Sequence, residues 1–211
     1  MRLFLSVLIL IFSFQSFSKA SEISEFEIES MSVGESLLNH FTKEEIKLFI
    51  KSPNSFTYKD NKYVAISTHA SYDKYSASSD NDPYADTKDN YDYVGVIIKP
   101  TDEKYIIHEI SAYLNFPNDF EGCKIKMKEI VSYISSTLNY LKMETETSPH
   151  HYDKSGESIS YDTWFYLHNG YVATHCENWS EKLTKKHGWD DKLKVRIINL
   201  AFMEFITNEA Y

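Results

Sequence analysis

Arginine is almost absent from this chain, and the motifs that identify common enzyme and nucleotide-binding families are missing. The only arginines are Arg2 and Arg196, and the chain has six glycines and two cysteines. Because bidentate recognition of phosphate prefers the guanidinium group, so little arginine disfavours phosphate binding. The sequence also lacks a Gly-rich phosphate loop and the H-E-x-x-H, C-x-x-C and G-x-S-x-G motifs. No motif in the sequence therefore indicates a particular reaction.

Long apolar runs are missing everywhere except at the beginning. Arg2 precedes an apolar segment over residues 3–17, and Ser18-Lys19-Ala20 follows it with small residues at positions −3 and −1 of a cleavage site. A membrane-spanning helix needs about 20 apolar residues, which is longer than this run. We predict a secretory signal peptide over residues 1–20 and a periplasmic or secreted chain of residues 21–211 with no stable membrane insertion. An uncleaved N-terminal anchor is the alternative.

Basic residues are also few. Removing residues 1–20 takes away Arg2 and Lys19, so 20 basic residues remain against 31 acidic ones and the net charge is −11. An acidic surface repels phosphate backbones and anionic lipid heads, so nucleic acid is excluded as a partner and membrane-surface binding is disfavoured. The remaining 191 residues are enough for one domain with a hydrophobic core.

The two cysteines are Cys123 and Cys176. An even pair in an exported protein predicts a disulfide, with two buried thiols, catalysis or metal binding as the alternatives. Cys123 falls on the apolar face of a helix expected over residues 120–142, and Cys176 falls on the apolar face of a strand. Both side chains are therefore expected to face the same core, as a disulfide requires.

The periodicity of apolar residues predicts an α+β domain with a largely antiparallel sheet of about five strands and helices packed on one face. Two short helices open it, with capping boxes at Ser32 and Thr42, and Asn199 caps a helix at the end. His108 falls on an apolar strand face, which predicts a buried histidine with a hydrogen-bond partner. Strand-forming residues are concentrated at 63–68, 91–99, 105–116, 158–168, 171–177 and 193–197.

Asn169-Gly170 predicts a two-residue type I′ hairpin turn that places Leu167 opposite Val172. The outward face of this hairpin would then carry Trp164, Tyr166, His168, Tyr171 and His175. In that register Trp164 lies opposite His175 and His168 lies opposite Tyr171. An exposed aromatic face of this kind is typical of a binding surface. The alternatives are that other elements cover the face, or that His168 and His175 capture a metal.

His150, His151 and Asp153 form the densest group of ligand-type side chains. Imidazole and carboxylate groups suit zinc or copper, while a solvated loop and a general acid/base pair are the alternatives. Asp80-Asn81-Asp82 matches the start of a calcium-binding loop, but the required glycine and glutamate further along are missing, so we expect a solvated loop there.

Three stretches of the chain resemble a family of small exported bacterial proteins of unknown function. They are FEIESMSVGESLL at residues 26–38, HHYDKSG at 150–156 and CENWSEK at 176–182. The likeness extends over most of the mature chain. It implies a single exported domain and carries no activity.

The sequence as a whole favours an acidic, exported domain of the cell envelope that binds an envelope protein or a small polar ligand without catalysis. A metal-dependent hydrolase using His150, His151 and Asp153 is the alternative from another class. A structural envelope component with no pocket is a third. No cofactor is predicted.

Overall fold

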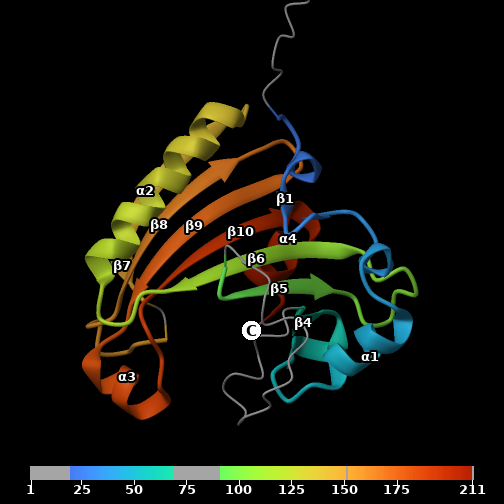
Figure 1. Cartoon of the computed structure of the whole chain (residues 1–211), viewed down its shortest axis with the longest axis horizontal. Helices are drawn as coiled ribbons and strands as arrows, with labels where there is room; N and C mark the ends of the chain where they lie inside the picture. The colour runs from blue at the N-terminus through green and yellow to red at the C-terminus, as the bar shows by residue number, and fades with distance from the viewer. Residues whose placement is uncertain (1–19, 69–90, 151, 211) are drawn as a thin grey trace, which may run out of the picture.

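One eight-stranded antiparallel sheet dominates the computed structural model, which describes residues 20–68, 91–150 and 152–210 (Figure 1). Its strand order is β3-β4-β5-β6-β10-β9-β8-β7. The strands are β3 (Phe56–Thr57), β4 (Val64–Ser67), β5 (Tyr93–Ile98), β6 (Ile107–Asn115), β7 (Lys142–Pro149), β8 (Ile159–Tyr166), β9 (Gly170–Asn178) and β10 (Lys192–Asn199). The α+β class and the antiparallel sheet are confirmed, whereas the prediction of about five strands is wrong. The predicted signal segment up to residue 19 and the Asp80 loop lie outside the described residues.

The two outermost strands are the ones that the sequence pattern missed. β3 has only two residues, and β7 reads KMETETSP, in which polar residues occupy both faces. An edge strand with one solvated side needs no apolar alternation. The sequence predicts that residues 138–142 continue the long helix, but it ends at Thr137, where Leu138 adopts an extended conformation with a φ of −101° and a ψ of 138°.

Helices cover both faces of the sheet rather than one. The helices are α1 (Lys43–Lys51), α2 (Phe120–Thr137), α3 (Glu181–His187) and α4 (Leu200–Asn208). Ile197 faces the core under α2, whereas the next residue, Ile198, packs against Phe202 and Phe205 of α4 on the opposite face. The predicted cap is present, since Oδ1 of Asn199 accepts from the Phe202 N–H at 2.9 Å. No helix in the described part of the chain is long and apolar enough to cross a bilayer.

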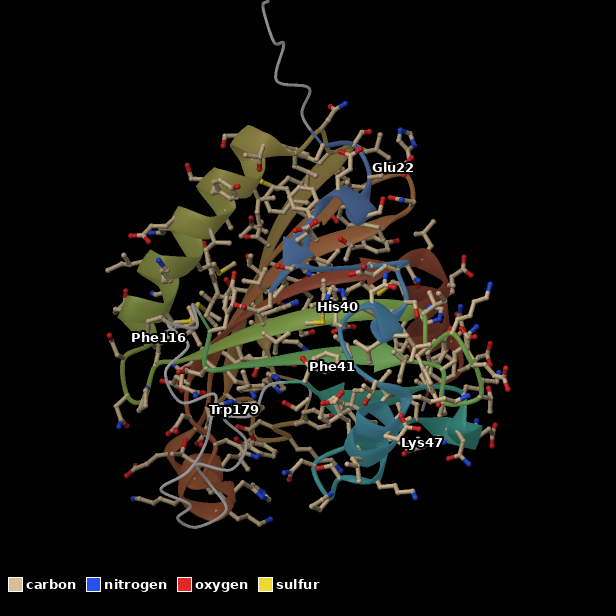
Figure 2. The ribbon with its side chains drawn as sticks, turned by 45° about the vertical axis from the view of Figure 1, so that its right-hand side comes forward. Glu22, His40, Phe41, Lys47, Phe116 and Trp179 are labelled. Atoms are coloured by element: carbon tan, nitrogen blue, oxygen red, sulfur yellow. A yellow bond between two sulfur atoms is a disulfide. The ribbon has the colours of Figure 1, made fainter. Side chains whose placement is uncertain are left out.

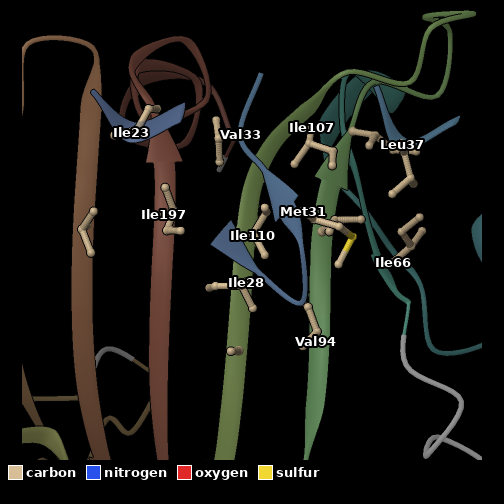
Figure 3. Close-up of a cluster of buried hydrophobic side chains, with 14 of the residues drawn as sticks. Ile23, Ile28, Met31, Val33, Leu37, Ile66, Val94, Ile107, Ile110 and Ile197 are labelled. Carbon is tan, nitrogen blue, oxygen red and sulfur yellow. The ribbon is translucent and has the colours of Figure 1, made fainter. Parts of the chain in front are cut away.

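The first face of the sheet is covered by the N-terminal segment and α2. The segment runs through the 3₁₀ turn η1 (Ile23–Glu25), the short strands β1 (Glu27–Ile28) and β2 (Met31–Ser32) and the 3₁₀ turn η2 (Leu37–Asn39). Figure 3 shows its buried side chains lying over Val94, Ile110 and Ile197 of the sheet. Phe41 packs against the same cluster, and Figure 2 shows it on this side of the sheet.

A helix predicted after Ser32 does not form. Gly34 adopts a φ of 97°, and its N–H donates to the carbonyl of Ile107 at 2.9 Å, so the chain turns to pair with the start of β6. The glutamate of that predicted capping box, Glu35, still accepts from the Ser32 N–H at 2.6 Å. The second box, at Thr42, is confirmed as the cap of α1.

A disulfide fastens α2 to the sheet. Cys123 and Cys176 are fully buried and bonded, with their Cα atoms 6.0 Å apart, as the sequence predicted. Met127 of α2 and Leu193 of β10 pack around the bond. The helix is thereby fixed across β9 and β10, on the face opposite to α4.

The β8–β9 hairpin is present, but its turn lies one residue earlier than predicted. Leu167 pairs with Gly170 through an N–H···O bond of 2.9 Å, so His168 and Asn169 form the turn. Gly170 lies in β9, where an added Cβ would meet the Ile198 carbonyl oxygen at 2.2 Å. The register shifts by two residues, which keeps each side chain on its predicted face but changes its partner.

His108 lies on the α4 face rather than on the apolar face predicted for it. The β5–β6 register shifts between Ile97 and Ile98, which makes His108 the extra residue of a bulge. Its Nδ1 lies 2.9 Å from the amide nitrogen of Asn199, and its ring meets that of Tyr63 at 5.1 Å. It is buried and hydrogen-bonded, as expected of a structural histidine.

Candidate functional site

A cavity of about 720 Å³ opens over the sheet face that carries α4. It is lined by six strands, by α4, and by the loops after β3, before β8, after β9 and before β10. The lining residues are Tyr58, Tyr93, Tyr113, Ser148, Pro149, His150, Tyr152, Ser160, Asp162, Trp164, His175, Glu177, Trp179, Trp189, Lys192, Lys194, Arg196, Met203, Ile206 and Thr207. Among the described residues, α4 packs on one end of this face, and the cavity lies beside it. Both the size and the aromatic and polar lining are typical of a small-molecule site.

The floor of the cavity is a row of side chains that crosses the sheet. Strand register places Tyr93 opposite Tyr113, Tyr113 opposite Lys194, Lys194 opposite His175, and His175 opposite Asp162. Because directly paired residues of antiparallel strands share a face, all five project into the cavity side. Residues from five different strands thus form one continuous surface.

A buried ion pair lies beside this row. Arg196 grips Glu109 through two hydrogen bonds, from Nε at 2.9 Å and from an Nη atom at 2.5 Å. Burial by itself would raise the pKa of Glu109, which is 2% exposed, but Arg196 and Lys194 outweigh it and hold that pKa at about 2. Burial would lower the pKa of Arg196, but the carboxylate of Glu109 raises that pKa above its ordinary value. Glu109 is therefore ionised and is held by Arg196 and Lys194.

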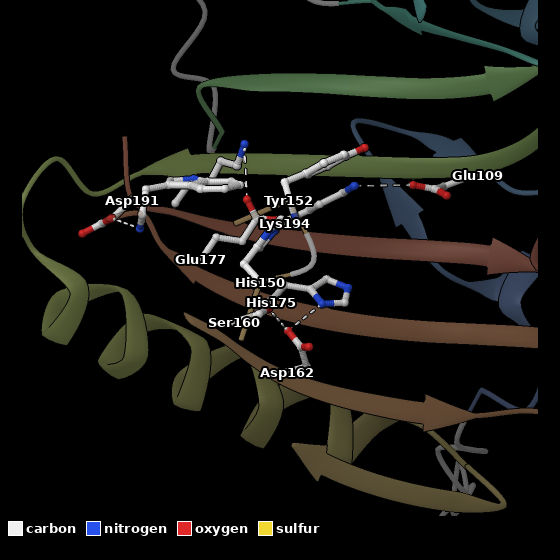
Figure 4. Close-up of polar contacts among 11 residues, drawn as sticks. Glu109, His150, Tyr152, Ser160, Asp162, His175, Glu177, Asp191 and Lys194 are labelled. Carbon is white, nitrogen blue, oxygen red and sulfur yellow. Dashed lines mark hydrogen bonds and ion pairs between the residues drawn. The ribbon is translucent and has the colours of Figure 1, made fainter. Parts of the chain in front are cut away.

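His175 and Ser160 both bind Asp162. Nδ1 of His175 lies 2.9 Å from Oδ1 of Asp162, and the Ser160 hydroxyl donates to the same oxygen (Figure 4). Burial lowers the pKa of His175, and the Asp162 hydrogen bond only partly offsets this. A neutral His175 that donates from Nδ1 keeps its lone pair on Nε2. That buried Nε2 atom has no hydrogen-bond partner among the described residues.

The end of the cavity near Lys192 is walled by aromatic rings. The ring of Trp179 lies 4.6 Å from that of Trp189 and 4.2 Å from that of His150, measured between centroids. Asp191 fixes this loop by accepting from the Trp179 backbone N–H at 2.8 Å. The Tyr152 ring stacks beside that of His150, with centroids 5.7 Å apart, and Tyr152 also lines the cavity.

Glu177 links this aromatic end to the floor. Its carboxylate lies 3.3 Å from Nζ of Lys192 and 3.9 Å from Nε2 of His150. Burial would raise its pKa, but His150, Lys192 and Lys194 together lower that pKa to about 2. Glu177 is thus a second ionised carboxylate that already has partners.

The structure separates the five residues predicted for the outward hairpin face. Trp164 and His175 line the cavity, and their rings meet edge to face at 5.1 Å. They are not directly opposite, as the predicted register had it, because Trp164 pairs with Ala173 and His175 pairs with Asp162. Only part of the predicted surface therefore belongs to the site.

The other three residues lie nearer the hairpin turn. Tyr166 pairs with Tyr171, correcting the predicted pairing of His168 with Tyr171, and donates from its hydroxyl to Glu144 of β7. That hydrogen bond raises the pKa of Tyr166 to about 12. His168 is exposed in the turn. None of these three residues lines the cavity.

The predicted metal ligands do not converge in what the structure describes. His150 faces Glu177 and Trp179 in the cavity wall, and His151 lies outside the described residues. The carboxylate of Asp153 accepts from the backbone N–H and the hydroxyl of both Ser155 and Ser158, which closes its own loop. Among the described residues, no group of three or more His, Cys, Asp or Glu side chains is placed to hold a metal ion.

Sequence reasoning missed the cations of β10. Lys192, Lys194 and Arg196 alternate with apolar residues in the stretch KLKVRI, so all three share the face away from Leu193 and Val195. That alternation is visible in the sequence and indicates a basic stripe on one strand. Its position beside Asp162, His175 and Glu177 is not visible, because it depends on which strands pair.

Comparison of the chain with protein-family models, with curated proteins and with solved structures found no match. The resemblance to a family of exported bacterial proteins stays a prediction. The cavity is therefore the feature of the molecule that bears on its function.

Proposed function

We propose that this protein is an exported, non-catalytic binding domain that holds a small polar ligand in the cavity over β6, β10, β9 and β8. The observation that carries the proposal is the cavity of about 720 Å³, lined by aromatic rings and by a few polar groups fixed by hydrogen bonds. Rings supply contact area, and fixed polar groups orient a ligand, which is how small-molecule sites are usually built.

The arrangement of Ser160, Asp162 and His175 supports binding rather than hydrolysis. A serine nucleophile requires its hydroxyl to bond to the histidine base, which the carboxylate then orients. Here Ser160 and His175 both bond to Asp162. The geometry supplies a rigid polar surface and no activated nucleophile.

Export is supported by the chemistry of the cysteine pair. The Cys123–Cys176 bond is fully buried and anchors the longest helix. Such structural disulfides persist in oxidising compartments and are rare in the cytosol. Together with the predicted signal peptide, this favours the periplasm or the cell exterior as the place where the ligand is met.

Two tryptophan substitutions on the same strand test the cavity. Ser148 lines the cavity from β7, whereas the exposed neighbour Thr147 projects to the other face. Ser148→Trp should fill part of the cavity, and Thr147→Trp is the matched control. We expect crystals of the wild type and of Thr147→Trp, soaked with a small-fragment library, to show fragments in the cavity, and Ser148→Trp to exclude them. A wild-type cavity without bound fragments would overturn the proposed function.

A further inference from the structure

We propose that the cavity selects a hydroxylated organic acid, of the class of a hexuronic acid, and that the ammonium group of Lys194 is the counter-ion of the ligand carboxylate. This inference rests on the proposed function, because it names the class of ligand for the same cavity. The inference is based on the three cations of β10, Lys192, Lys194 and Arg196, which differ in how closely their partners hold them. It is also based on the groups that surround Lys194.

Lys194 is the cation of the row that has spare hydrogen-bonding capacity. Its Nζ forms an ion pair with Oε1 of Glu109 at 4.0 Å (Figure 4). That distance is beyond hydrogen-bond range, and Lys194 donates no hydrogen bond among the described residues. The same Nζ lies 5.1 Å from the centre of the Tyr113 ring. Its side chain is 19% exposed and lines the cavity, so a ligand can reach it. An ammonium group offers three donors, and a carboxylate is the strongest partner for them.

The other two cations of the stripe are already engaged. Arg196 holds Glu109 with two hydrogen bonds, and Lys192 holds Glu177 at 3.3 Å. Because the guanidinium fork is occupied, the site lacks the group that best recognises phosphate. The ammonium of Lys194, which makes no hydrogen bond among the described residues, matches one carboxylate, so the charge pattern favours a monocarboxylate over a phosphate.

The surroundings of Lys194 suit hydroxyl groups as well as a charge. Asp162 of β8 pairs with His175, and Glu177 of β9 pairs with Lys192. Each carboxylate has more acceptor sites than its contacts among the described residues occupy. Ligand hydroxyls can donate to these oxygens. A purely apolar acid would leave this capacity facing its hydrocarbon, at a desolvation cost.

The aromatic walls suit a saturated ring. Tyr152, Trp164 and Trp189 contribute rings to the cavity wall, and the two tryptophans are only partly buried. A pyranose ring carries apolar C–H faces together with peripheral hydroxyls, so it can lie against such rings while its hydroxyls reach the carboxylates. A cationic ligand is disfavoured, because Lys192 and Lys194 both lie over the Tyr113 ring, at 5.9 Å and 5.1 Å.

Calorimetry with four probes tests the ligand class on the wild-type protein. D-glucuronate carries the carboxylate and the hydroxyls, D-glucose lacks the carboxylate, benzoate lacks the hydroxyls, and inorganic phosphate replaces the carboxylate. We expect glucuronate to bind and each other probe to bind about tenfold more weakly or not at all. Equal binding of glucose, benzoate or phosphate would overturn the proposal.

Two variants test the role of Lys194. Lys194→Met keeps the length of the apolar stem and removes the charge, and Lys126→Met removes a lysine from the exposed side of α2 as the matched control. We expect Lys194→Met to weaken glucuronate binding about ten- to hundredfold and Lys126→Met to leave it unchanged. Folding of both variants is checked by thermal unfolding, and the four-probe comparison stands even where Lys194→Met fails to fold.

The two failures can be told apart. Fragments that occupy the cavity while none of the four probes binds would overturn the ligand class and leave the binding function standing. A cavity that takes neither fragments nor probes would remove both.

Discussion

Glu109 contributes to stability through its charge, because it is buried against Arg196 and Lys194. A carboxyl whose pKa is about 2 in the folded state, against an ordinary 4.5, stabilises the fold wherever it is ionised in both states. That contribution is fully present above about pH 4.5 and is lost as the pH falls through 4.5 toward 2. Glu177, with a pKa also lowered to about 2, acts in the same direction.

Glu109→Gln should therefore lower the free energy of unfolding at pH 7 by about 3 kcal/mol, because it leaves the Arg196 guanidinium without its anion. The gap between the variant and the wild type should shrink as the pH falls from 4.5 toward 2, where Glu109 becomes protonated. Urea unfolding of the variant and of the wild type at a series of pH values measures the difference in unfolding free energy and its change with pH. Glu129→Gln, on the exposed side of α2, is the control and should cost less than about 0.5 kcal/mol. A gap independent of pH would contradict this account.

At the scale of elements, the β8–β9 hairpin shows why a strong local signal can give way. Asn-Gly favours a type I′ turn, yet Gly170 is needed in β9, where the Ile198 carbonyl oxygen and the Ile23 side chain leave no room for a Cβ. Oδ1 of Asn169 accepts from the Ile23 N–H at 3.2 Å, so contacts with a distant segment hold the turn one residue earlier. Each side chain of the hairpin still lies on its predicted face of the sheet, because a register shift of two residues preserves the alternation of side chains along a strand.

The apolar contact between α2 and the sheet is reinforced by one covalent bond that joins residues 53 positions apart. Replacing both Cys123 and Cys176 by alanine should lower the free energy of unfolding by about 3–4 kcal/mol, because the unfolded chain loses its cross-link. Chemical denaturation of the oxidised wild type and of the double variant measures the difference. The cavity lies on the opposite face of the sheet, so ligand binding by the folded double variant should stay close to that of the wild type. Markedly weaker ligand binding by the folded double variant than by the wild type would contradict the separation of the two faces.

At the scale of the whole molecule, one face of the sheet packs the hydrophobic core and the other carries the cavity. The N-terminal segment and α2 seal one face with apolar side chains and the disulfide. In the part of the chain that the structure describes, α4 covers one end of the other face, and the remainder carries the charged and aromatic row. A sheet that is sealed on one side can afford polar groups on the other, and this division gives the protein its cavity.

The predicted cleavage after Ala20 can be tested by intact mass. Ala20 donates to the Thr137 carbonyl at 3.0 Å and accepts from the Asn139 N–H at 2.7 Å, at an exposed end of α2 where water can replace it. We expect protein purified from the exported fraction to have the intact mass of residues 21–211 less two hydrogen atoms, which reductant restores. A mass that includes residues 1–20 would contradict cleavage, and a mass unchanged by reductant would contradict the disulfide.

The amino-acid sequence by itself determined the local features of this protein. Alternation gave most of the central strands, three-and-four spacing gave α2, side-chain oxygens gave the caps of α1 and α4, and two inward-facing cysteines gave the disulfide. These follow from neighbours along the chain, whose geometry is fixed by the backbone. The pairing of strands, the face taken by α4 and the meeting of Lys194 with His175 and Asp162 were decided only in the tertiary structure. They join residues far apart in sequence, and no local preference encodes which polar strand becomes an edge or which cation meets which carboxylate.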